Sequence, residues 1–383
     1  MNAEEQKHYF SIHLLDWYRA NKRDLPWRRS KNPYHIWVSE VMLQQTRVDT
    51  VIPYFHRFTE LFPTVEALAE APEEEVLKAW EGLGYYSRAR NLQSAVREVH
   101  ERYGGVVPSD KAEISSLKGV GPYTSGAILS IAYNKPEPAV DGNVMRVLSR
   151  YFVIEEDIMK PATRVKMERL AQELIPEGAA GDFNQALMEL GAMVCTPRSP
   201  YCLTCPVRLG CAGREQGMED KLPVKKKAKP PRPELRVVAL IEGVGEHAGK
   251  WLIRQRPQEG LLARMWELPH AAWPEPVWGT DENSAAALCE ALLTEDNVRV
   301  TLGKWFMDTE HTFSHIQWNM KVFRCRLGDE AAHPRGAGEW IPFRYRWVGP
   351  EELESYAFPN VFVRIMKAWQ EVQEERETGS PGN

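Results

Sequence analysis

Residues 117–128 read LKGVGPYTSGAI, in which Gly119 and Gly121 bracket one valine and a proline follows at once. A Gly-x-Gly turn that leads into a helix points backbone amides outward, where they can bind a phosphate. A dinucleotide-binding fingerprint would follow a strand and continue as G-x-G-x-x-G, but the patterns on both sides here are helical. The stretch therefore predicts a hairpin between two helices. Taken alone, such a hairpin is more often a plain connection than a binding site, and Tyr123 just inside it has no evident task.

The chain around this hairpin has a helical pattern from about residue 4 to residue 194. Apolar residues recur there at i, i+3 and i+4 in runs such as 36–58, and turns that carry Pro or Gly separate the runs. Residues 221–233, KLPVKKKAKPPRP, interrupt the pattern and predict an extended basic linker. This linker is a solvated spacer or a strap that faces phosphates, and the two interpretations are compatible.

Beyond the linker the hydrophobic period changes. The segments 236–243 and 250–257 predict two strands joined by a Gly-bearing turn, and 316–323 (IQWNMKVF) alternates apolar and polar residues. Helical patterns return in 284–293 and 361–373. We therefore expect a multidomain chain: an all-α region over 1–220, a linker over 221–233, an α+β domain over 234–373 and a disordered tail over 374–383.

The bulk composition is that of a soluble globular protein. The chain has 383 residues, of which 43% are hydrophobic and 26% charged, so it can bury the cores of two or three domains. The N-terminus lacks the apolar core of a signal peptide, and no apolar run approaches the ~18 residues of a membrane span. We expect a cytoplasmic, soluble protein. Its net charge of −5 argues against nonspecific coating of nucleic acid but leaves room for a local basic face.

Four of the six cysteines lie close together in the sequence, with the spacing Cys-x6-Cys-x2-Cys-x5-Cys. A secreted disulfide framework would spread its cysteines over a small domain. Four thiolates in one short loop can instead hold a tetrahedral metal ion or a cubane cluster, and their spacing does not separate zinc from iron–sulfur. The residues concerned are Cys195, Cys202, Cys205 and Cys211.

Two carboxylates stand out. Asp141 precedes Gly142 and Asn143 at a predicted helix start, where it is either a plain N-cap or a carboxylate held ionised beside a site. Glu40 shares the helical face of Ile36, where burial would raise its pKa and suit it to general-acid work, unless it lies at the edge of the stripe. A raised-pKa Glu and an ionised Asp are the pair that glycosidic bond cleavage uses.

Together these features resemble the endonuclease III-like helix-hairpin-helix superfamily of DNA glycosylases, and within it the adenine DNA glycosylases of the MutY type. The resemblance covers nearly the whole chain and is highly specific. It implies an all-α helix-hairpin-helix glycosylase domain with a 4Fe–4S loop, followed by an α+β Nudix-like domain. The motifs that carry it are LPWR (25–28), WVSEVMLQQTRV (37–48), GLGYYSRARNL (82–92), LKGVGPYTSGAI (117–128), VDGNVMRV (140–147), the cysteine loop (195–211), GLLARMWELP (260–269) and HTFSHIQW (311–318).

The resemblance implies roles for the residues of the reaction. Glu40 would protonate the adenine and later help to activate water, and Asp141 would stabilise the oxocarbenium ion or capture it covalently. Asn143 and Tyr123 would orient these two, with Tyr123 near Asp141 or the sugar. The lyase branch of the superfamily has a lysine at the position of Tyr123. Because a phenol cannot form a Schiff base, we expect a monofunctional glycosylase.

The resemblance also implies DNA contacts. The adenine must leave the duplex to be reached. Its pocket would be lined by Trp27, Arg28 and Gln44, and Gln45 and Tyr85 would enter the base stack. Core packing is the plainer interpretation of Trp27 and, taken alone, of Tyr85.

The C-terminal half would serve recognition rather than hydrolysis. A true Nudix hydrolase carries a run of glutamates that binds magnesium, whereas this chain has only scattered Glu290 and Glu295. The resemblance implies that the loop Phe313, Ser314 and His315 probes 8-oxoguanine opposite the adenine, with Thr46 as a further contact. Gln185 stands where some relatives have a glutamate, and no catalytic role is assigned to it.

We therefore expect a monomeric, cytoplasmic, nucleoid-associated glycosylase that holds a 4Fe–4S cluster and acts on double-stranded DNA containing 8-oxoguanine:adenine or guanine:adenine pairs. Three alternatives remain at this point. The first is an endonuclease III-type lyase, which Tyr123 and the second domain disfavour. The second is a non-catalytic iron–sulfur DNA sensor, which the joint presence of Glu40 and Asp141 disfavours. The third is a Nudix pyrophosphatase, which the missing run of glutamates disfavours.

Overall fold

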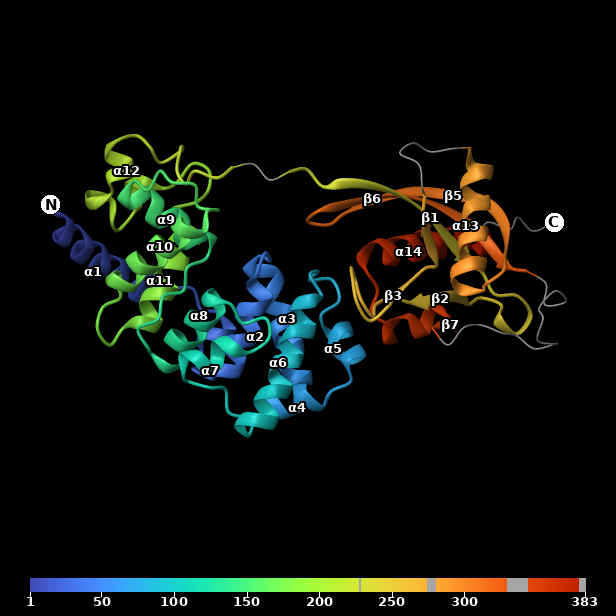
Figure 1. Ribbon diagram of the computed structural model, residues 1–383, viewed down its shortest axis with the longest axis horizontal. Helices are drawn as coiled ribbons and strands as arrows, with labels where there is room; N and C mark the ends of the chain where they lie inside the picture. The colour runs from blue at the N-terminus through green and yellow to red at the C-terminus, as the bar shows by residue number, and fades with distance from the viewer. Residues whose placement is uncertain (227–228, 274–279, 329–343, 379–383) are drawn as a thin grey trace. The chain divides into compact units, whose positions relative to one another are not determined.

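The computed structural model describes residues 1–226, 229–273, 280–328 and 344–378. The chain forms two compact units, Met1–Ala79 with Ser87–Ala228, and Trp80–Tyr86 with Lys229–Asn383. Within the described ranges the first unit is helical and the strands belong to the second (Figure 1). The predicted fold class, a helical region followed by an α+β region, is confirmed. None of the described helices is long and apolar enough to cross a membrane.

Polar side chains define where several helices of the first unit begin. Asn2, Asn32, Thr64, Asp110 and Asp141 each accept hydrogen bonds from backbone amides of the turn that follows. The helices are α1 (Ala3–Asn21), α2 (Pro33–Leu43), α3 (Val48–Leu61), α4 (Val65–Glu70), α5 (Glu73–Ala79), α6 (Ser87–Tyr103), α7 (Lys111–Ser116), α8 (Pro122–Tyr133), α9 (Gly142–Phe152), α10 (Pro161–Leu174), α11 (Ala180–Met193) and α12 (Ala212–Glu215), with short 3₁₀ turns η1 (Pro26–Arg28), η2 (Cys202–Thr204) and η3 (Arg208–Gly210).

The predicted hairpin is formed by α7 and α8. Gly119 has a left-handed φ of 77°, and a Cβ there would lie 2.8 Å from the Cβ of Asn91. Both constraints require glycine. Gly121 is the N-cap of α8, and Pro122 occupies the first helical position, where its missing N–H costs nothing.

A second glycine of α8 lets an extended segment approach closely. A Cβ on Gly126 would lie 2.0 Å from the carbonyl oxygen of Pro138. The segment that contains Pro138 leads directly to Asp141 at the start of α9. The fold of the hairpin therefore determines where Asp141 can lie.

One predicted helical run is wrong. The apolar spacing of residues 36–58 continues without interruption, but the structure divides it into α2 and α3. The break includes Gln45, whose left-handed φ of 59° is incompatible with a helix. Tertiary contacts of the loop 44–47, described below, account for the break.

The core of the first unit joins both ends of its sequence. Buried residues of α1 pack with those of α9 and α11, and Cys195, Cys205 and Cys211 contact the same cluster. The N-terminal helix thus helps to support the cysteine loop. The main buried members are Phe10, Leu14, Tyr18, Val144, Val147, Leu148, Tyr151, Phe183, Leu187 and Leu190.

The second unit contains two sheets. A four-stranded sheet has the order β4-β1-β6-β5, and a three-stranded sheet has the order β3-β2-β7. β1 and β6 run parallel, with Arg232 opposite Ile316, and the other pairs are antiparallel. The elements are β1 (Arg232–Ile241), β2 (Trp251–Gln255), β3 (Trp266–Glu267), β4 (His270–Ala272), α13 (Asp281–Asp296), β5 (Val300–Thr312), β6 (Ile316–Leu327), β7 (Tyr345–Val348), α14 (Asn360–Thr378), and the 3₁₀ turns η4 (Gly245–His247) and η6 (Pro350–Ser355).

The second half of β1, residues 237–241, is buried on both faces, and its side chains alternate between two cores. Val238 and Leu240 join the cluster that includes residues of α14. Val237, Ala239 and Ile241 join the cluster that includes residues of α13. This period-2 alternation explains the continuous apolar run of the strand.

Several sequence-based boundaries need correction. The segments 236–243 and 250–257 are strands, but β1 and β2 belong to different sheets and share only the isolated bridge between Glu242 and Trp251. The predicted linker ends earlier, because β1 begins at Arg232. The tail predicted to be disordered from residue 374 is helical as far as Thr378, since α14 continues, and residues 379–383 lie outside the described part.

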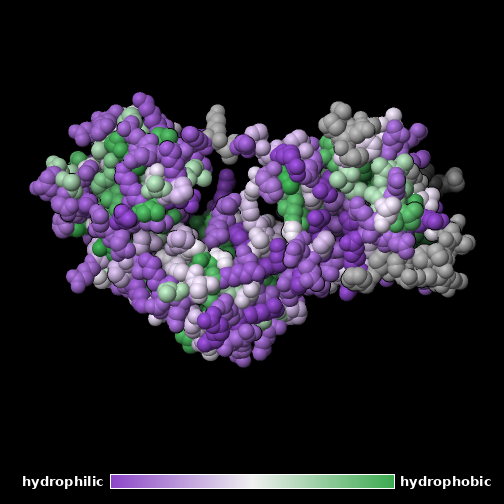
Figure 2. Space-filling model, in the orientation of Figure 1, coloured by the Kyte–Doolittle hydropathy of each residue, from purple (hydrophilic) through white to green (hydrophobic). Residues whose placement is uncertain are grey.

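The visible face of the molecule is mainly hydrophilic, with hydrophobic residues in small scattered groups (Figure 2). This is ordinary for a protein surface in water.

We expect Gly126→Ala to lower the midpoint of thermal unfolding, because the added methyl group must displace the Pro138 backbone. Overpacking of this kind costs about 1–3 kcal/mol. Gly142→Ala is the matched control, since a Cβ there meets nothing within 4 Å. Equal midpoints for the two variants in a calorimetric scan would contradict the tight contact.

Candidate active site

A cavity of about 680 Å³ lies in the first unit. It brings together most of the predicted site residues, although they come from separate segments. The predicted residues that line it are Trp27, Arg28, Glu40, Gln44, Gln45, Thr46, Gly119, Gly121, Tyr123, Asp141 and Asn143, and Gln185 lines it as well.

Glu40 lies on α2, and only 4% of its surface is exposed. Burial raises the pKa of Glu40 from 4.5 to about 7, against the opposing effect of a hydrogen bond that Tyr123 donates. Two smaller effects are included in this value: the nearby carboxyl of Asp141 raises the pKa, and Arg28 lowers it. Near neutral pH both forms of Glu40 are therefore populated, as a general acid requires.

Tyr123 forms its carboxyl hydrogen bond with Glu40, and Asp141 is close enough to affect the pKa of Tyr123. Its hydroxyl donates to Glu40 Oε2 at 2.5 Å and lies 3.3 Å from the sulfur of Met188. Burial, together with the neighbouring carboxyls, raises the pKa of Tyr123 well above 10. The phenol therefore keeps its proton and acts as a donor.

Asp141 is an N-cap and also faces the cavity, so both interpretations offered by the sequence apply. Its carboxylate accepts hydrogen bonds from the backbone N–H of Val144 at 2.7 Å and from the side chain of Asn143 at 2.9 Å. Burial raises the pKa of Asp141 above its usual value, and these hydrogen bonds oppose the rise. The sequence showed the helix start, which favours the ionised form, but not the burial.

A chain of hydrogen bonds leads from Asp141 to the cysteine loop. Asn143 bonds to Asp141, and Arg146 donates to Asn143 Oδ1 at 2.8 Å and to the carbonyl oxygen of Cys195 at 2.8 Å. Arg146 also donates to the carbonyl of Gly191. The cysteine loop and the cavity are thus mechanically connected.

A buried ion cluster forms another wall of the cavity. Glu189 on α11 is 1% exposed, and it accepts hydrogen bonds from Arg23 at 2.7 Å and Arg28 at 2.9 Å. Although burial works against it, these hydrogen bonds lower the pKa of Glu189 to about 2, so Glu189 stays ionised. Trp27 lies between the two arginines in sequence and is 5% exposed.

Sequence analysis missed the role of Glu189 and Arg23. Glu189 lies one helical turn after Gln185, on the same face of α11 and beside its apolar positions. An acid at such a position is rarely buried without a partner, so the sequence pattern could have indicated a buried ion pair.

The loop between α2 and α3 is held by one arginine. Arg88, near the start of α6, donates to the carbonyl oxygens of Val41 at 2.8 Å and Met42 at 3.1 Å, and also to that of Gln44. These carbonyls would otherwise lack partners at the helix end. Gln44 then reaches Thr124 with its amide at 3.4 Å, and Gln45 is exposed.

The remaining predicted contacts belong to the second unit. Phe313, Ser314 and His315 connect β5 to β6, with Ser314 and His315 exposed. Tyr85 has a left-handed φ of 49° and is 45% exposed, which argues against core packing. The hydroxyl of Ser314 lies 3.3 Å from that of Tyr85.

The four clustered cysteines line one small cavity of about 30 Å³, together with Arg150, Arg208 and Arg214. Arg150 donates to the sulfur of Cys195 at 3.4 Å and to the carbonyls of Thr196 and Pro197. Burial, together with the neighbouring thiols, raises the pKa of the Cys205 thiol to about 12. Among the described residues, no group of three or more metal-ligating side chains is arranged to hold a single ion.

Comparisons with known proteins agree with this geometry. The chain matches the HhH-GPD superfamily base excision DNA repair protein family over residues 38–177 and the NUDIX domain over residues 240–368. It is 36% identical to the adenine DNA glycosylase of Homo sapiens, over 93% of this chain and 73% of that protein. It is 30% identical to the adenine DNA glycosylase of Schizosaccharomyces pombe, over 96% of this chain and 91% of that protein. A solved structure of a thermostable thymine-DNA glycosylase superimposes with a TM-score of 0.51 at 30% identity, covering 56% of this chain and 100% of that one.

We expect Arg88→Met to speed amide hydrogen exchange in residues 44–47 by about tenfold or more, because hydrogen bonds from a charged donor are worth ~1.5–3 kcal/mol each. Arg97→Met is the matched control. Arg97 lies on the same helix and donates to the carbonyls of Ala69 and Ala71 at 2.8 and 3.0 Å, so it caps a different helix end in the same way. If both variants left exchange in 44–47 unchanged, Arg88 would not support this loop.

Proposed function

We propose that this chain, which belongs to the adenine DNA glycosylase family and is thus a base-excision DNA repair enzyme, removes adenine opposite 8-oxoguanine or guanine without cutting the strand. The observation that carries the proposal is the constellation in the first-unit cavity. A buried Glu40 with a pKa of about 7 lies beside Tyr123 and Asp141. Such a pair of carboxyls suits cleavage of an N-glycosidic bond.

Glu40 is the proposed general acid. Protonation of a ring nitrogen makes adenine a better leaving group, and a carboxyl with a pKa near the working pH is an efficient proton donor. After the base departs, the same carboxylate can accept a proton from the attacking water. The hydroxyl of Tyr123 keeps Glu40 in one orientation in both states.

Asp141 is proposed to lie beside the positive charge that develops on the sugar and to stabilise it electrostatically. Asn143 and the Val144 amide hold its carboxylate at the start of α9. It would either stabilise the oxocarbenium ion or capture it as a covalent intermediate. Trapping of a covalent adduct between the sugar and Asp141 would support the covalent intermediate.

The absence of strand cutting follows from the side chains around the cavity. Lyase chemistry needs an amine that attacks the sugar. Among the described residues that line the cavity, none is a lysine, and Tyr123 occupies the hairpin position that carries lysine in the lyase branch.

Entry of the base requires its extrusion from the duplex. The cavity volume of about 680 Å³ falls within the range of sites for small organic groups, ~300–1,000 Å³. Trp27, Arg28 and Gln44 line it, and the exposed Gln45 is proposed to fill the space that the adenine leaves. Tyr85 is proposed to enter the stack beside the lesion, with Thr46 and the loop Phe313–His315 contacting 8-oxoguanine.

The cysteine loop fits a 4Fe–4S cluster, as the family implies. A cubane spaces its four thiolates more widely than a single ion does, because each thiolate binds a different iron atom. Four cysteines around one cavity, with Arg150 donating to the Cys195 sulfur, suit this arrangement. Cys195, Cys202, Cys205 and Cys211 would hold the cluster, which would stiffen the loop, and Arg146 would transmit that rigidity to Asn143. We further propose that the active form is a monomer on duplex DNA.

The proposal is tested by single-turnover excision on duplexes with one 8-oxoguanine:adenine or guanine:adenine pair, using cluster-loaded protein. We expect adenine release from both, faster opposite 8-oxoguanine, with strand breakage only after hot alkali. Breakage without alkali would show that another amine replaces the missing lysine. Binding without adenine release would leave recognition but refute catalysis.

We expect Glu40→Gln to abolish excision and to raise the unfolding midpoint at pH 8. The Glu40 carboxyl ionises near 4.5 when unfolded and near 7 when folded. Between these values the folded chain holds a proton that the unfolded chain has released, so wild-type stability falls as pH rises across this window. The amide lacks this penalty, and its advantage should disappear toward pH 4.5. An advantage that does not change with pH would contradict the raised pKa.

A further inference from the structure

The turn between β5 and β6 divides into an anchor and an exposed part. The N–H of Phe313 donates to the carbonyl of Ile316 at 2.7 Å and closes the turn. The ring of Phe313 is partly buried and packs edge-on against Trp318, with centroids 4.8 Å apart at 75°. Ser314 and His315 are exposed. The position of these two side chains therefore depends on how firmly Trp318 holds Phe313.

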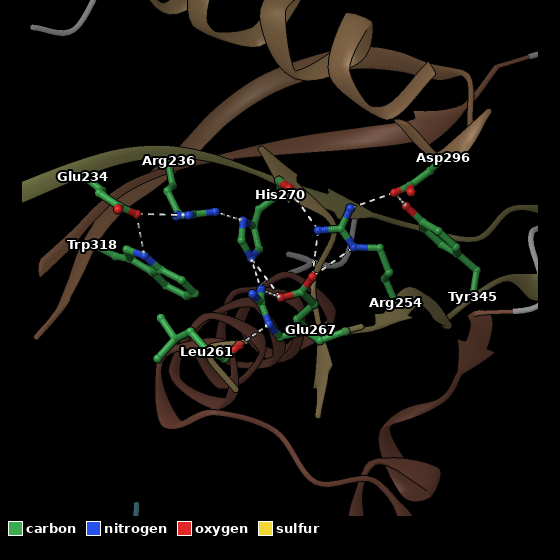
Figure 3. Close-up of polar contacts among 10 residues, drawn as sticks. Glu234, Arg236, Arg254, Leu261, Glu267, His270, Asp296, Trp318 and Tyr345 are labelled. Carbon is green, nitrogen blue, oxygen red and sulfur yellow. Dashed lines mark hydrogen bonds and ion pairs between the residues drawn. The ribbon is translucent and has the colours of Figure 1, made fainter. Parts of the chain in front are cut away.

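Trp318 is fully buried and has two polar partners on β1. Its indole N–H donates to Glu234 at 3.2 Å, and the guanidinium of Arg236 lies 4.5 Å from the centre of its ring. Arg236 also donates to Glu234 at 3.0 Å. We call Glu234, Arg236 and Trp318 the trio (Figure 3).

The trio is attached to a buried charge network. Arg236 lies 3.2 Å from Nδ1 of His270, whose Nε2 lies 2.8 Å from Glu267 (Figure 3). Burial lowers the pKa of His270 to about 4, so the ring is neutral at physiological pH. It then accepts from Arg236 at Nδ1 and donates to Glu267 at Nε2. Glu267, 1% exposed, is further held by Arg254 at 2.7 Å and Arg256 at 2.6 Å.

The backbone places the trio directly beside the turn. The N–H of Arg232 donates to the carbonyl of His315 at 2.9 Å, and the parallel pairing of β1 with β6 starts there. Glu234 is opposite Trp318 in this register. The turn is therefore supported through its backbone by Arg232 and through its side chains by the trio.

We propose that the trio is a positioning and specificity-determining group, which places Ser314 and His315 so that the enzyme prefers 8-oxoguanine over guanine. This rests on the proposed function, in which the turn contacts the lesion. The two bases differ only in a carbonyl oxygen at C8 and a hydrogen on N7. Discrimination between them depends on hydrogen bonds whose geometry tolerates little displacement.

The same domain contains a matched control. Arg324 lies 4.1 Å above the ring of Trp369 and donates to Glu242 at 2.9 Å. Glu242 follows the far end of β1, and Arg324 pairs with Leu240. The side chains of Arg324 and Glu242 are 28% and 21% exposed, against 20% and 22% for Arg236 and Glu234. This second group thus repeats the ion pair and the cation–π contact at the opposite end of the same two strands, with its tryptophan on α14.

The test compares Arg236→Met with Arg324→Met in single-turnover excision on 8-oxoguanine:adenine and guanine:adenine duplexes. We expect Arg236→Met to reduce the ratio of the two rates roughly five- to tenfold, a loss between those typical of an exposed and of a desolvated cation–π contact. The loss should fall on the 8-oxoguanine duplex, and Arg236→Lys should restore part of the ratio. Arg324→Met should keep the wild-type ratio.

Amide hydrogen exchange over residues 311–318 gives a readout that does not depend on activity. Arg236→Met should speed exchange there, and Arg324→Met should not. The proposal would be overturned if Arg236→Met folds and keeps both the wild-type ratio of excision rates and the wild-type rate of amide exchange over residues 311–318. If Arg236→Met does not fold, Trp318→Phe, which removes the indole N–H, takes its place under the same criteria. A wild-type enzyme without preference for 8-oxoguanine would instead refute the lesion specificity itself, whatever the exchange shows.

Discussion

Burying the carboxyl of Glu40 is the constraint on which the active region depends. An ionised carboxylate that is removed from water is unstable without a partner. The pKa of the buried Glu40 is raised, and its hydrogen-bond partner is a phenol rather than a cation. The nearby Glu189 shows the other solution, since Arg23 and Arg28 keep it ionised. Two buried glutamates that line one cavity thus differ in charge near neutral pH. Glu189 stays ionised because it faces two guanidinium groups, whereas Glu40, which faces a phenol, is present in both its neutral and its ionised form. Arg28 is held by Glu189, which limits how far it can lower the pKa of Glu40.

Arginine side chains support the irregular segments of this unit. Arg88 binds the carbonyls at the end of α2, Arg146 binds those of Gly191 and Cys195, and Arg150 binds those of Thr196 and Pro197. Loops between helices expose carbonyl groups that need partners, and a guanidinium group can serve several at once. These loops are therefore held in place by arginines that do not line the cavity of about 680 Å³.

The second unit uses buried charge differently. Its network of arginines, Glu267 and neutral His270 is largely buried, and it connects β1, β2, β3 and β4. Partial replacement of such a network would leave charges unpaired, so its members depend on one another. In the first unit, the buried Glu40 is proposed to act as a general acid. In the second unit, the buried charges are proposed to hold a turn in position.

The sequence by itself determined the class of each half, the hairpin, the cysteine loop and the positions of the two carboxyls along the chain. These depend on local patterns, such as turn residues, cap residues and hydrophobic period. Only the tertiary structure decided the partners. Tyr123 forms a hydrogen bond with Glu40, 83 residues away in the sequence, and Glu189 is paired with arginines more than 160 residues away. The break at Gln45 and the burial of Asp141 were hidden for the same reason. Desolvation and hydrogen-bond partners arise from packing between distant segments, which no local pattern records.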